Sequence, residues 1–213
     1  MSGLLDNAPV IPVVAIDAAD KALDLCEALQ RGGIHAIEVT LRTAEAIDAI
    51  AQIKKYCPDM ILGVGTVLTP DDVSRSEDAG ADFLVSPGLS PKLQSRLLKS
   101  ERLVLPGTAT ASEALSAYEA GFHQVKLFPA GAVGGAALLK SLFAPMPKIK
   151  FMPTGGVRIN NMLDYLSLPN VFSVGGTWIA TRDDIHKSDW KQIESKAANA
   201  TQLALSLSPD LPS

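Results

Sequence analysis

Cysteine and histidine are scarce in this chain of 213 residues, which has two of the former and three of the latter. Cys26 falls in an expected helix and Cys57 at a helix end, which is neither a disulfide framework nor the spacing of a zinc site. His35, His123 and His186 lie far apart in the sequence. We therefore expect no bound metal, and the cysteine usage fits a reducing compartment.

Long apolar runs and a surplus of one charge are also missing. No uninterrupted apolar stretch approaches the roughly 20 residues of a membrane span, and the first residues lack the basic-then-apolar pattern of a secretion signal. The formal net charge is -4, with acidic and basic residues interleaved, which argues against binding to nucleic acid or to an anionic membrane. We expect a cytoplasmic protein whose partners are small molecules, with no nucleic acid and no membrane among them.

The chain is apolar enough to form a large core, since 47% of its residues are hydrophobic. No segment rich in proline, glycine or serine divides it. We predict a single domain over residues 1–213, with a short N-terminal arm and a frayed C-terminal tail around Ser206–Ser213.

Short β-rich segments alternate with segments of helical spacing along the whole sequence. The predicted strands are Val10–Ile16, Ile34–Thr40, Met60–Val64, Ala81–Ser86, Leu103–Pro106, Gln124–Phe128, Ile149–Pro153 and Val171–Val174. The clearest predicted helices are Ala18–Gln30, Ala44–Tyr56, Ala111–Ala120 and Ile159–Leu166, and Thr69 and Thr110 have the sequence context of N-caps. Such alternation specifies a parallel sheet covered by helices. Eight units favour an α/β fold of the closed (β/α)8 type, a TIM barrel, over an open doubly wound sheet.

Lys126 is the residue that best indicates chemistry, because it interrupts the apolar run Gln124–Pro129. A lysine held away from water favours its neutral amine, and that amine is the nucleophile which Schiff-base catalysis on a carbonyl requires. The structural alternative is a lysine at a strand end whose stem reaches solvent.

The alternation of side chains along a barrel strand assigns each residue to the lumen or to the helix layer. Glu38, Thr40 and Arg42 share one face of their strand, and the apolar residues between them share the other. The same alternation directs Lys126 inward, so we predict that a carboxylate, a guanidinium and an amine converge in the lumen. The alternative is that a Lys126–Glu38 ion pair merely fills the barrel.

Two glycine pairs follow the last two predicted strands, at Gly155-Gly156 and Gly175-Gly176. In eight-stranded barrels this pair of loops commonly binds phosphate, through backbone N–H groups and the start of a following helix. A substrate that carries a phosphate is the functional interpretation, and tight turns without a ligand are the structural one.

The segment Gly63–Leu68 resembles a dinucleotide-binding fingerprint only in part, since Leu68 occupies the place of the third glycine. We reject that interpretation. Thr66 instead places a hydroxyl at the end of the third predicted strand, where it could orient a substrate carboxylate beside Arg42, although a purely structural threonine remains open.

Several motifs occur together, in a fixed order along the chain. They are Glu38-Val39-Thr40-Leu41-Arg42-Thr43, Gly63-Val64-Gly65-Thr66-Val67-Leu68, Ser86-Pro87-Gly88, Pro106-Gly107-Thr108, Lys126-Leu127-Phe128-Pro129-Ala130, Pro153-Thr154-Gly155-Gly156 and Gly175-Gly176-Thr177-Trp178. With them the chain, from about Val10 to Trp178, closely resembles the 2-keto-3-deoxy-6-phosphogluconate aldolases, also called 4-hydroxy-2-oxoglutarate aldolases.

The resemblance implies a class I aldolase of the Entner–Doudoroff route, a homotrimer of barrels that uses no metal and no organic cofactor. It implies Lys126 as the Schiff-base lysine and Glu38 as the general acid and base. The remaining roles that it implies are a carboxylate clamp, by Arg42 and Thr66, and a phosphate site, by Gly155, Gly156, Gly175 and Thr177 with Thr154 beside them.

Two departures from the family pattern are mild. Leu127 stands where the family often has a second aromatic residue, and Thr177 stands where it often has serine, which keeps the hydroxyl. They bear on the choice among aldehydes and not on the reaction class.

The expected substrates are thus a keto-acid sugar phosphate and pyruvate. Two functions of other classes remain open from the sequence. One is a phosphosugar isomerase or epimerase that uses Glu38 as a base without a covalent adduct, and the other is a sugar-phosphate binding domain without catalysis.

Overall fold

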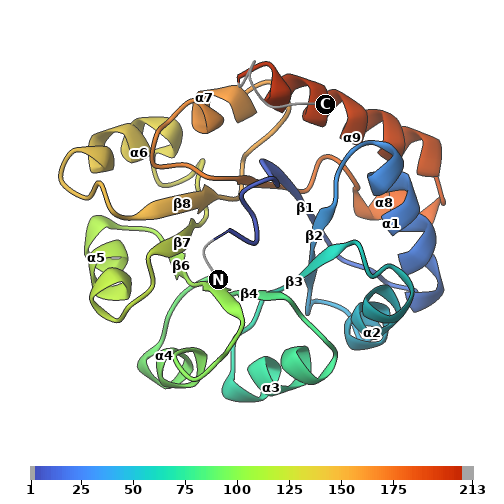
Figure 1. Cartoon of the computed structure of the whole chain (residues 1–213), viewed down its shortest axis with the longest axis horizontal. Helices are drawn as coiled ribbons and strands as arrows, with labels where there is room; N and C mark the ends of the chain where they lie inside the picture. The colour runs from blue at the N-terminus through green and yellow to red at the C-terminus, as the bar shows by residue number, and fades with distance from the viewer. Residues whose placement is uncertain (1–2, 208–213) are drawn as a thin grey trace.

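Parallel strands and helices alternate along residues 3–207, the part of the chain that the computed structural model describes (Figure 1). The strands are β1 (Val10–Val14), β2 (Ala36–Thr40), β3 (Ile61–Gly65), β4 (Phe83–Val85), β5 (Leu103–Leu105), β6 (Gly107–Thr108), β7 (Gln124–Leu127), β8 (Lys150–Pro153) and β9 (Val174–Gly176). The helices are the 3-10 helix η1 (Ala19–Lys21) and the α-helices α1 (Ala22–Arg31), α2 (Ala46–Tyr56), α3 (Pro70–Asp78), α4 (Pro91–Leu97), α5 (Ala111–Glu119), α6 (Gly135–Phe143), α7 (Met162–Leu166), α8 (Arg182–His186) and α9 (Trp190–Leu205). Most of the predicted C-terminal tail, residues 208–213, lies outside the described residues.

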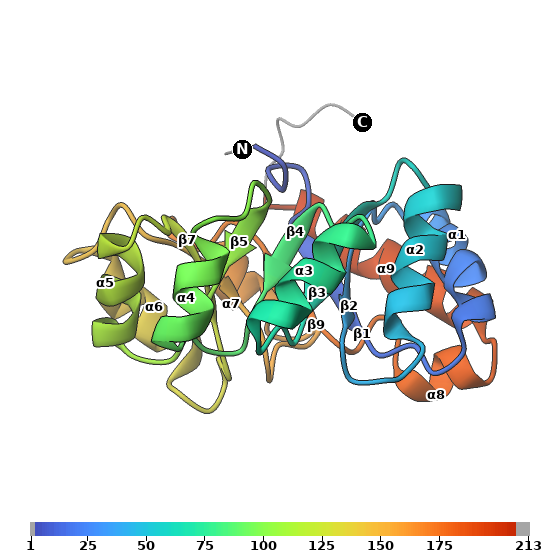
Figure 2. The same cartoon turned by 90° about the horizontal axis from the view of Figure 1, so that it is seen from below.

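The strands form a closed ring, which confirms the predicted barrel. One sheet has the order β5-β4-β3-β2-β1-β9 and the other β6-β7-β8, with every pair parallel. Bridges between Thr154 and Gly175 and between Phe151 and Val171 join β8 to β9. At the other seam only Pro106 separates β5 from β6. The helices lie outside this ring (Figures 1 and 2).

Two strand predictions needed correction. The fifth predicted strand is split at Pro106, which has no N–H to donate to a ladder; its carbonyl still accepts from the backbone N–H of Lys126 at 2.9 Å. The last strand begins at Val174 rather than Val171 and continues through Gly175 and Gly176. Glycine is depleted in strands in general, so the sequence pattern predicted the end of this last strand before its two glycines.

Helix starts agree with the sequence signals. The side chains of Thr69 and Thr110 each accept a hydrogen bond from the backbone N–H of the residue three positions later. The carboxylates of Asp72 and Glu113 in turn accept a hydrogen bond from the backbone N–H of the same threonine. Both are complete capping boxes, which fix where α3 and α5 leave the barrel rim.

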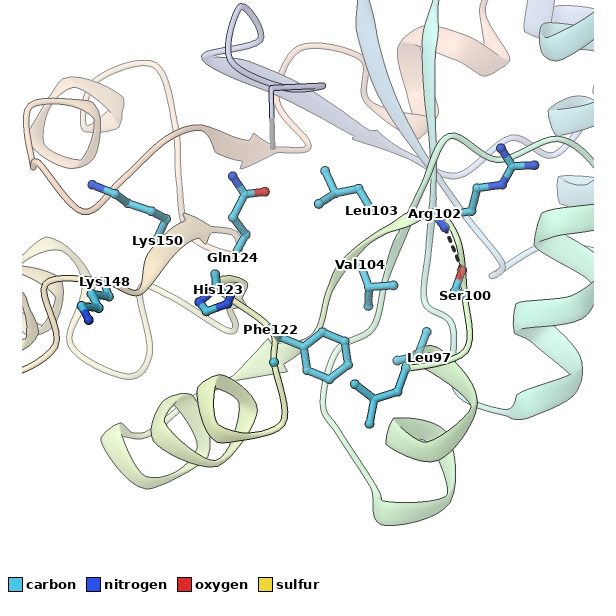
Figure 3. Close-up of a pocket in the computed structure, with 12 residues that line it drawn as sticks. Leu97, Ser100, Arg102, Leu103, Val104, Phe122, His123, Gln124, Lys148 and Lys150 are labelled. Carbon is cyan, nitrogen blue, oxygen red and sulfur yellow. Dashed lines mark hydrogen bonds between the residues drawn. The ribbon is translucent and has the colours of Figure 1, made fainter. Parts of the chain in front are cut away.

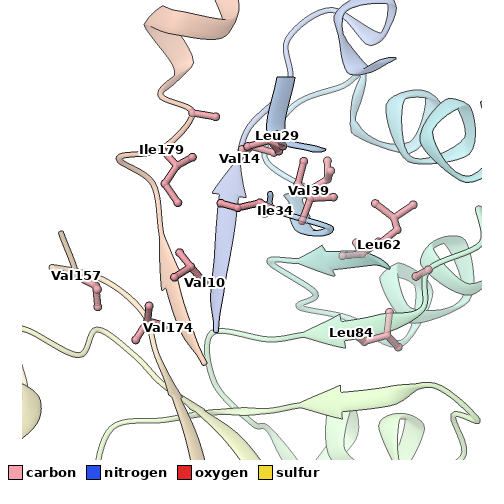
Figure 4. Close-up of a cluster of buried hydrophobic side chains, with 14 of the residues drawn as sticks. Val10, Val14, Leu29, Ile34, Val39, Leu62, Leu84, Val157, Val174 and Ile179 are labelled. Carbon is pink, nitrogen blue, oxygen red and sulfur yellow. The ribbon is translucent and has the colours of Figure 1, made fainter. Parts of the chain in front are cut away.

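Apolar side chains form two clusters, one on each face of the strands. The larger lies between strands and helices and includes Leu29, Val39, Leu62 and Leu84 (Figure 4). The smaller fills the lumen and contains Leu5, Ala8, Ile11, Ala36, Phe83, Val85, Leu105 and Met152. This division follows the predicted alternation of side chains along each strand.

The N-terminal arm closes one end of the lumen. Leu5 is 2% exposed and belongs to the lumen cluster, and the hydroxyl of Ser173 donates to the carbonyl of Ala8 at 2.6 Å. Because the arm leads into the start of β1, the closed end is the one where the strands begin. Figure 2 shows the arm across this end. Any site in the lumen must therefore open at the ends where the strands finish.

Candidate active site

Lys126 and Glu38 meet inside the barrel, as the alternation of side chains predicted. Lys126 lies on β7 with its neighbours Val125 and Leu127 in the outer cluster, and it is 4% exposed. Its Nζ is 3.2 Å from Oε1 of Glu38, which lies on β2 and is fully buried. The structure therefore excludes a lysine that reaches solvent.

Two buried oxygen atoms of predicted site residues have no hydrogen-bond partner among residues 3–207. Among the described residues, no group donates a hydrogen bond to Oε2 of Glu38, and the buried hydroxyl of Thr154 has no partner either. Buried polar atoms in folded proteins are nearly always hydrogen-bonded, so such exceptions call for an explanation. A polar ligand bound beside the ion pair would give Oε2 of Glu38 a partner.

Glycines of β3 create the space that Glu38 occupies. A Cβ added to Gly65 would lie 2.0 Å from Oε1 of Glu38, and one added to Gly63 would lie 2.1 Å from the ring of Phe83. Sequence analysis dismissed these glycines together with the dinucleotide fingerprint. The signal that could have shown their role is their inward position on a strand adjacent to that of Glu38.

Phe128 is a second residue that sequence analysis left without a role. Its ring centroid is 5.3 Å from Nζ of Lys126. A ring face at this distance attracts the ammonium form and presents an apolar wall to the neutral amine. Its sequence signal was its position two residues after Lys126, directly after the end of β7.

Arg42 and Thr66 lie together at the mouth of the lumen. Nε of Arg42 donates to the hydroxyl of Thr66 at 3.0 Å. Thr66 has a positive φ of 60°, a conformation that costs energy for a β-branched residue and that concentrates at functional sites. Arg42 follows the end of β2 and is exposed, so the prediction that it joins the buried charges was wrong: its side chain lies at the rim, because the strand has ended.

The proposed phosphate residues lie around the ends of β8 and β9. Gly155 and Gly156 have φ values of +91° and +80°, which favour glycine. Thr154 is buried, and its hydroxyl would lie 2.2 Å from a Cβ on Gly175. Thr177 is exposed just after β9.

The helix starts that we expected directly after these glycines are not there. The helix α7 begins at Met162 and α8 at Arg182, several residues beyond the glycines in both loops. Intervening residues form turns, and Thr181 caps α8 with its own side chain. Phosphate binding here would thus depend on backbone N–H groups and on side chains, and not on the dipole of a helix that starts at the glycines.

A cleft of about 340 Å³ opens at this end of the barrel. Thr40, Arg42 and Thr177 are among the residues that line it. It is large enough for a small ligand. One residue of the proposed clamp, Arg42, and one of the proposed phosphate site, Thr177, thus share this cleft.

A larger hollow, of about 490 Å³, lies at the opposite end, where β5, β7 and β8 begin (Figure 3). Leu103, Gln124 and Lys150 line it, and none of the predicted site residues does. In barrels of this type the chemistry lies where strands end and the other end serves stability. We therefore place the site in the smaller cleft and in the lumen beneath it.

Residues 3–207 offer little support for other chemistry. No group of three or more histidine, cysteine, aspartate or glutamate side chains in this range could hold a metal ion. Cys26 is fully buried, and burial raises the pKa of its thiol, which disfavours the reactive thiolate. None of the helices in the same range combines the length and the apolar composition that crossing a membrane would need.

The arrangement provides an amine nucleophile, a carboxyl group within hydrogen-bonding distance of it, and cationic and hydroxyl groups at the mouth. An amine and an adjacent acid are what imine formation with a ketone requires, since the amine attacks and the acid removes the ketone oxygen as water.

Comparisons with known proteins agree with this chemistry. The family model described as KDPG and KHG aldolase matches residues 1–196. The 2-dehydro-3-deoxy-phosphogluconate aldolase of Pseudomonas aeruginosa is 43% identical over 199 residues, which is 93% of this chain and 90% of that protein. The KHG/KDPG aldolase of Escherichia coli K12 is 37% identical and covers 93% of both chains.

Solved structures agree as well. The KDPG aldolase of Legionella pneumophila, with pyruvate captured as a covalent carbinolamine intermediate, superposes with a TM-score of 0.90 at 41% identity, covering 92% of this chain and 96% of that one. The enzyme of Zymomonas mobilis with 3-phosphoglycerate gives a TM-score of 0.85 at 35% identity, covering 93% of each chain.

Proposed function

The chain belongs to the KDPG and KHG aldolase family, and on this premise we propose that it is a class I aldolase that cleaves 2-keto-3-deoxy-6-phosphogluconate to pyruvate and glyceraldehyde 3-phosphate. The observation that carries the proposal is the buried Lys126 amine 3.2 Å from the Glu38 carboxyl. The same groups would cleave 4-hydroxy-2-oxoglutarate to pyruvate and glyoxylate. Neither reaction requires a metal or an organic cofactor in this mechanism.

The first steps form a covalent imine. Glu38 takes a proton from the Lys126 ammonium, which leaves a neutral amine and a protonated carboxyl group. The amine attacks C2 of the substrate to give a carbinolamine. Glu38 returns its proton to the departing hydroxyl, water leaves, and a cationic imine remains that accepts electrons from the adjacent carbon.

The next steps break the carbon–carbon bond. Glu38, now a carboxylate again, removes the proton of the C4 hydroxyl, directly or through a water. The C3–C4 bonding electrons move into the imine, glyceraldehyde 3-phosphate leaves, and a pyruvate enamine remains. Protonation of the enamine at C3 and hydrolysis of the imine release pyruvate and regenerate the amine. One carboxyl group therefore acts alternately as acid and base.

The ends of the substrate are held by different parts of the cleft. We assign its carboxylate to Arg42 and Thr66, whose side chains are already hydrogen-bonded to each other. We assign its phosphate to the backbone of Gly155, Gly156 and Gly175 and to Thr177, with Thr154 beside them. Support comes from their common position where β8 and β9 end.

We also propose that the protein is a cytoplasmic homotrimer. The family resemblance implies the trimer, and cysteine usage fits the compartment. A solved designed cage, built by fusing symmetric oligomeric domains, contains a related chain with a TM-score of 0.81 at 27% identity, covering 93% of this chain and 74% of that one. Light scattering should give three times the chain mass of 22.4 kDa; the mass of a single chain would contradict this part.

Trapping the imine with borohydride tests the reaction class. Pyruvate plus borohydride should add one reduced pyruvate irreversibly per chain, at Lys126, as located by mass spectrometry of peptides. Lys126→Met should abolish both trapping and cleavage, with turnover lowered by about 10⁴-fold or more. Lys150→Met is the matched control, because Lys150 lies on the adjacent strand, is only partly buried, and donates to the carbonyl of Pro169; it should trap normally.

Unmodified wild-type protein under saturating pyruvate would defeat the proposal. An isomerase would convert phosphosugar without being trapped, and a binding domain would take it up without conversion.

A further inference from the structure

Arg182 lies in the cleft but has no part in the mechanism above. It is the first residue of α8 and follows Thr177 by five positions. The cleft of about 340 Å³ that contains Arg42 and Thr177 is lined by Arg182 as well. Two arginine residues thus line one cavity whose lining contains no aspartate or glutamate.

Asp17 holds one edge of this guanidinium and leaves another edge open. Nε of Arg182 donates to Oδ2 of Asp17, and Nη2 donates to Oδ1. A guanidinium has five N–H donors in a plane, and these two bonds occupy only one side of the fork. No hydrogen bond from Nη1 is recorded to any described residue. Arg182 is therefore oriented and still able to donate.

The rest of α8 is fixed to the same segment of chain. Nζ of Lys21 donates to the carbonyl of Ile185 at 3.2 Å and to that of His186. The segment between β1 and α1 thus supports α8 at its first turn, through Asp17, and at its last, through Lys21. This anchoring holds Arg182 at the rim of the cleft.

The two acidic residues of α8 pair with lysines and not with Arg182. Asp183 pairs with Lys187 at 2.7 Å, and Asp184 pairs with Lys196 at 2.6 Å. The hydrogen bond from Arg182 lowers the pKa of Asp17, so that carboxylate stays charged and keeps its hold. Asp17 thus offsets part of the charge of Arg182, and the donors of its free edge remain available to an anion beside Arg42.

We propose that Arg182, positioned by Asp17, binds the distal phosphate of the substrate and thereby selects phosphorylated keto acids over short ones. The inference rests on the proposed function. The two guanidinium groups would divide the two anionic ends, with Arg42 on the carboxylate and Arg182 on the phosphate beside Thr177. Arginine is suited to this because its donors match phosphate oxygens in pairs.

The test compares two substrates in matched variants. Arg182→Met removes the charge but keeps an unbranched side chain, and it should raise KM for 2-keto-3-deoxy-6-phosphogluconate about tenfold, as expected for loss of one charge-assisted hydrogen bond. Its kcat should change by less than about twofold, and the constants for 4-hydroxy-2-oxoglutarate should not change. Arg182→Lys should recover part of the loss, and Asp17→Asn should raise KM for the phosphorylated substrate alone.

Arg31→Met is the control, because Arg31 also forms an exposed pair, with Glu194 at 2.8 Å, between α1 and α9. It should leave both substrates unaffected. An equal loss on the two substrates in Arg182→Met, or no loss on either, would overturn the proposal, since the Asp17–Arg182 pair would then only anchor α8. If Asp17→Asn left KM for the phosphorylated substrate unchanged, Asp17 would have no part in positioning Arg182 for phosphate.

Trapping separates this proposal from the reaction class. Pyruvate has no phosphate, so Arg182→Met should be trapped by borohydride as efficiently as the wild type. Failure of the wild type to be trapped would refute the proposed function itself. Normal trapping with an unchanged substrate preference would refute only the role of Arg182. Thermal unfolding of each variant, measured first, establishes that the variant is folded. If Arg182→Met does not fold, Arg182→Lys takes its place in the comparison.

Discussion

The two ends of the barrel lumen are built from the same strands but have opposite chemistry. Where the strands begin, Leu5, Ile11, Ala36 and Phe83 belong to an apolar cluster closed by the N-terminal arm. Toward the ends of the strands, Glu38, Thr40, Lys126 and Thr154 are buried polar residues. A difference of one or two positions along a strand separates a core from a site.

The difference shows how the fold accommodates costly groups. A buried ion pair is expensive in desolvation, several kcal/mol per ion, and an apolar replacement is often neutral or stabilising. The polar end contains two buried oxygens without partners, whereas the apolar end is filled from the strands and from the arm. Stability and function are thus separated along the barrel axis, which is the general plan of such barrels.

The largest effect that sharpens this comparison is expected from Glu38→Gln at the polar end. The amide cannot exchange protons as a carboxyl group does, so kcat should fall by about 10²- to 10⁴-fold. The unfolding free energy should change by only about 1 kcal/mol, because glutamine keeps the shape and can still accept from Lys126. Steady-state kinetics and urea unfolding measure the two quantities.

Thr43→Val is a suitable control for that variant. Thr43 lies just beyond β2, and its hydroxyl donates to the carbonyl of Ile16 at 2.5 Å, away from Lys126. The variant should lose a little stability and keep its turnover. A Glu38→Gln enzyme with nearly normal kcat would show that another group transfers the protons.

Phe83→Ala at the apolar end should have the reverse result. Phe83 is fully buried, with its ring against Gly63, and truncation of such a residue costs about 3–5 kcal/mol of unfolding free energy. At temperatures where the variant is folded, kcat/KM should stay close to the wild-type value. Leu115→Ala, at a residue of α5 that is 47% exposed, should cost far less.

The comparison would fail if Phe83→Ala lowered kcat as much as Glu38→Gln does while the protein was still folded. The two ends would then be coupled through the β3 glycines.

The smallest effect concerns the Glu77–Arg96 ion pair, which lies in the helix layer near the C-terminal ends of α3 and α4. Burial raises the pKa of Glu77, but hydrogen bonds from Arg96 and Ser100 outweigh it, and the pKa lies below its ordinary value of 4.5. The unfolded chain therefore binds this proton more tightly than the folded one. The stabilisation is present above about pH 4.5 and is lost as the pH falls through the lowered folded value.

Glu77→Gln should accordingly lower the unfolding free energy by about 1 kcal/mol at neutral pH, since the pair is partly exposed. The difference from the wild type should vanish in acid below the folded pKa, and kcat should be unaffected throughout. Urea unfolding at several pH values measures this. A difference that persists in acid would mean that packing, and not the charge, is responsible.

Sequence patterns predicted the repeating strands and helices because they depend on local periodicity. Both capping boxes were found for the same reason: the residues involved are three positions apart. The break at Pro106 and the extension of β9 through its glycines were missed, since a neighbouring strand decides whether a residue that forms strands poorly is nevertheless paired.

The candidate site was predictable to the same degree. Inward orientation of Glu38 and Lys126 follows from alternation along a strand, but Arg42 lies past the strand end, where alternation no longer applies. The role of Gly65 depends on the neighbouring strand, and Arg182 reaches the cleft only because Asp17 and Lys21 hold α8 there.

By itself, the sequence determined the order of the elements, the face of each strand that carries polar groups, and the family. Only the tertiary structure decided which groups meet: Lys126 and Glu38 are 88 residues apart, and Arg182 and Asp17 are 165 apart. The reason is physical. Periodicity and capping act within a few residues, whereas the distance between two strands of a ring depends on closure and register, which every strand sets together.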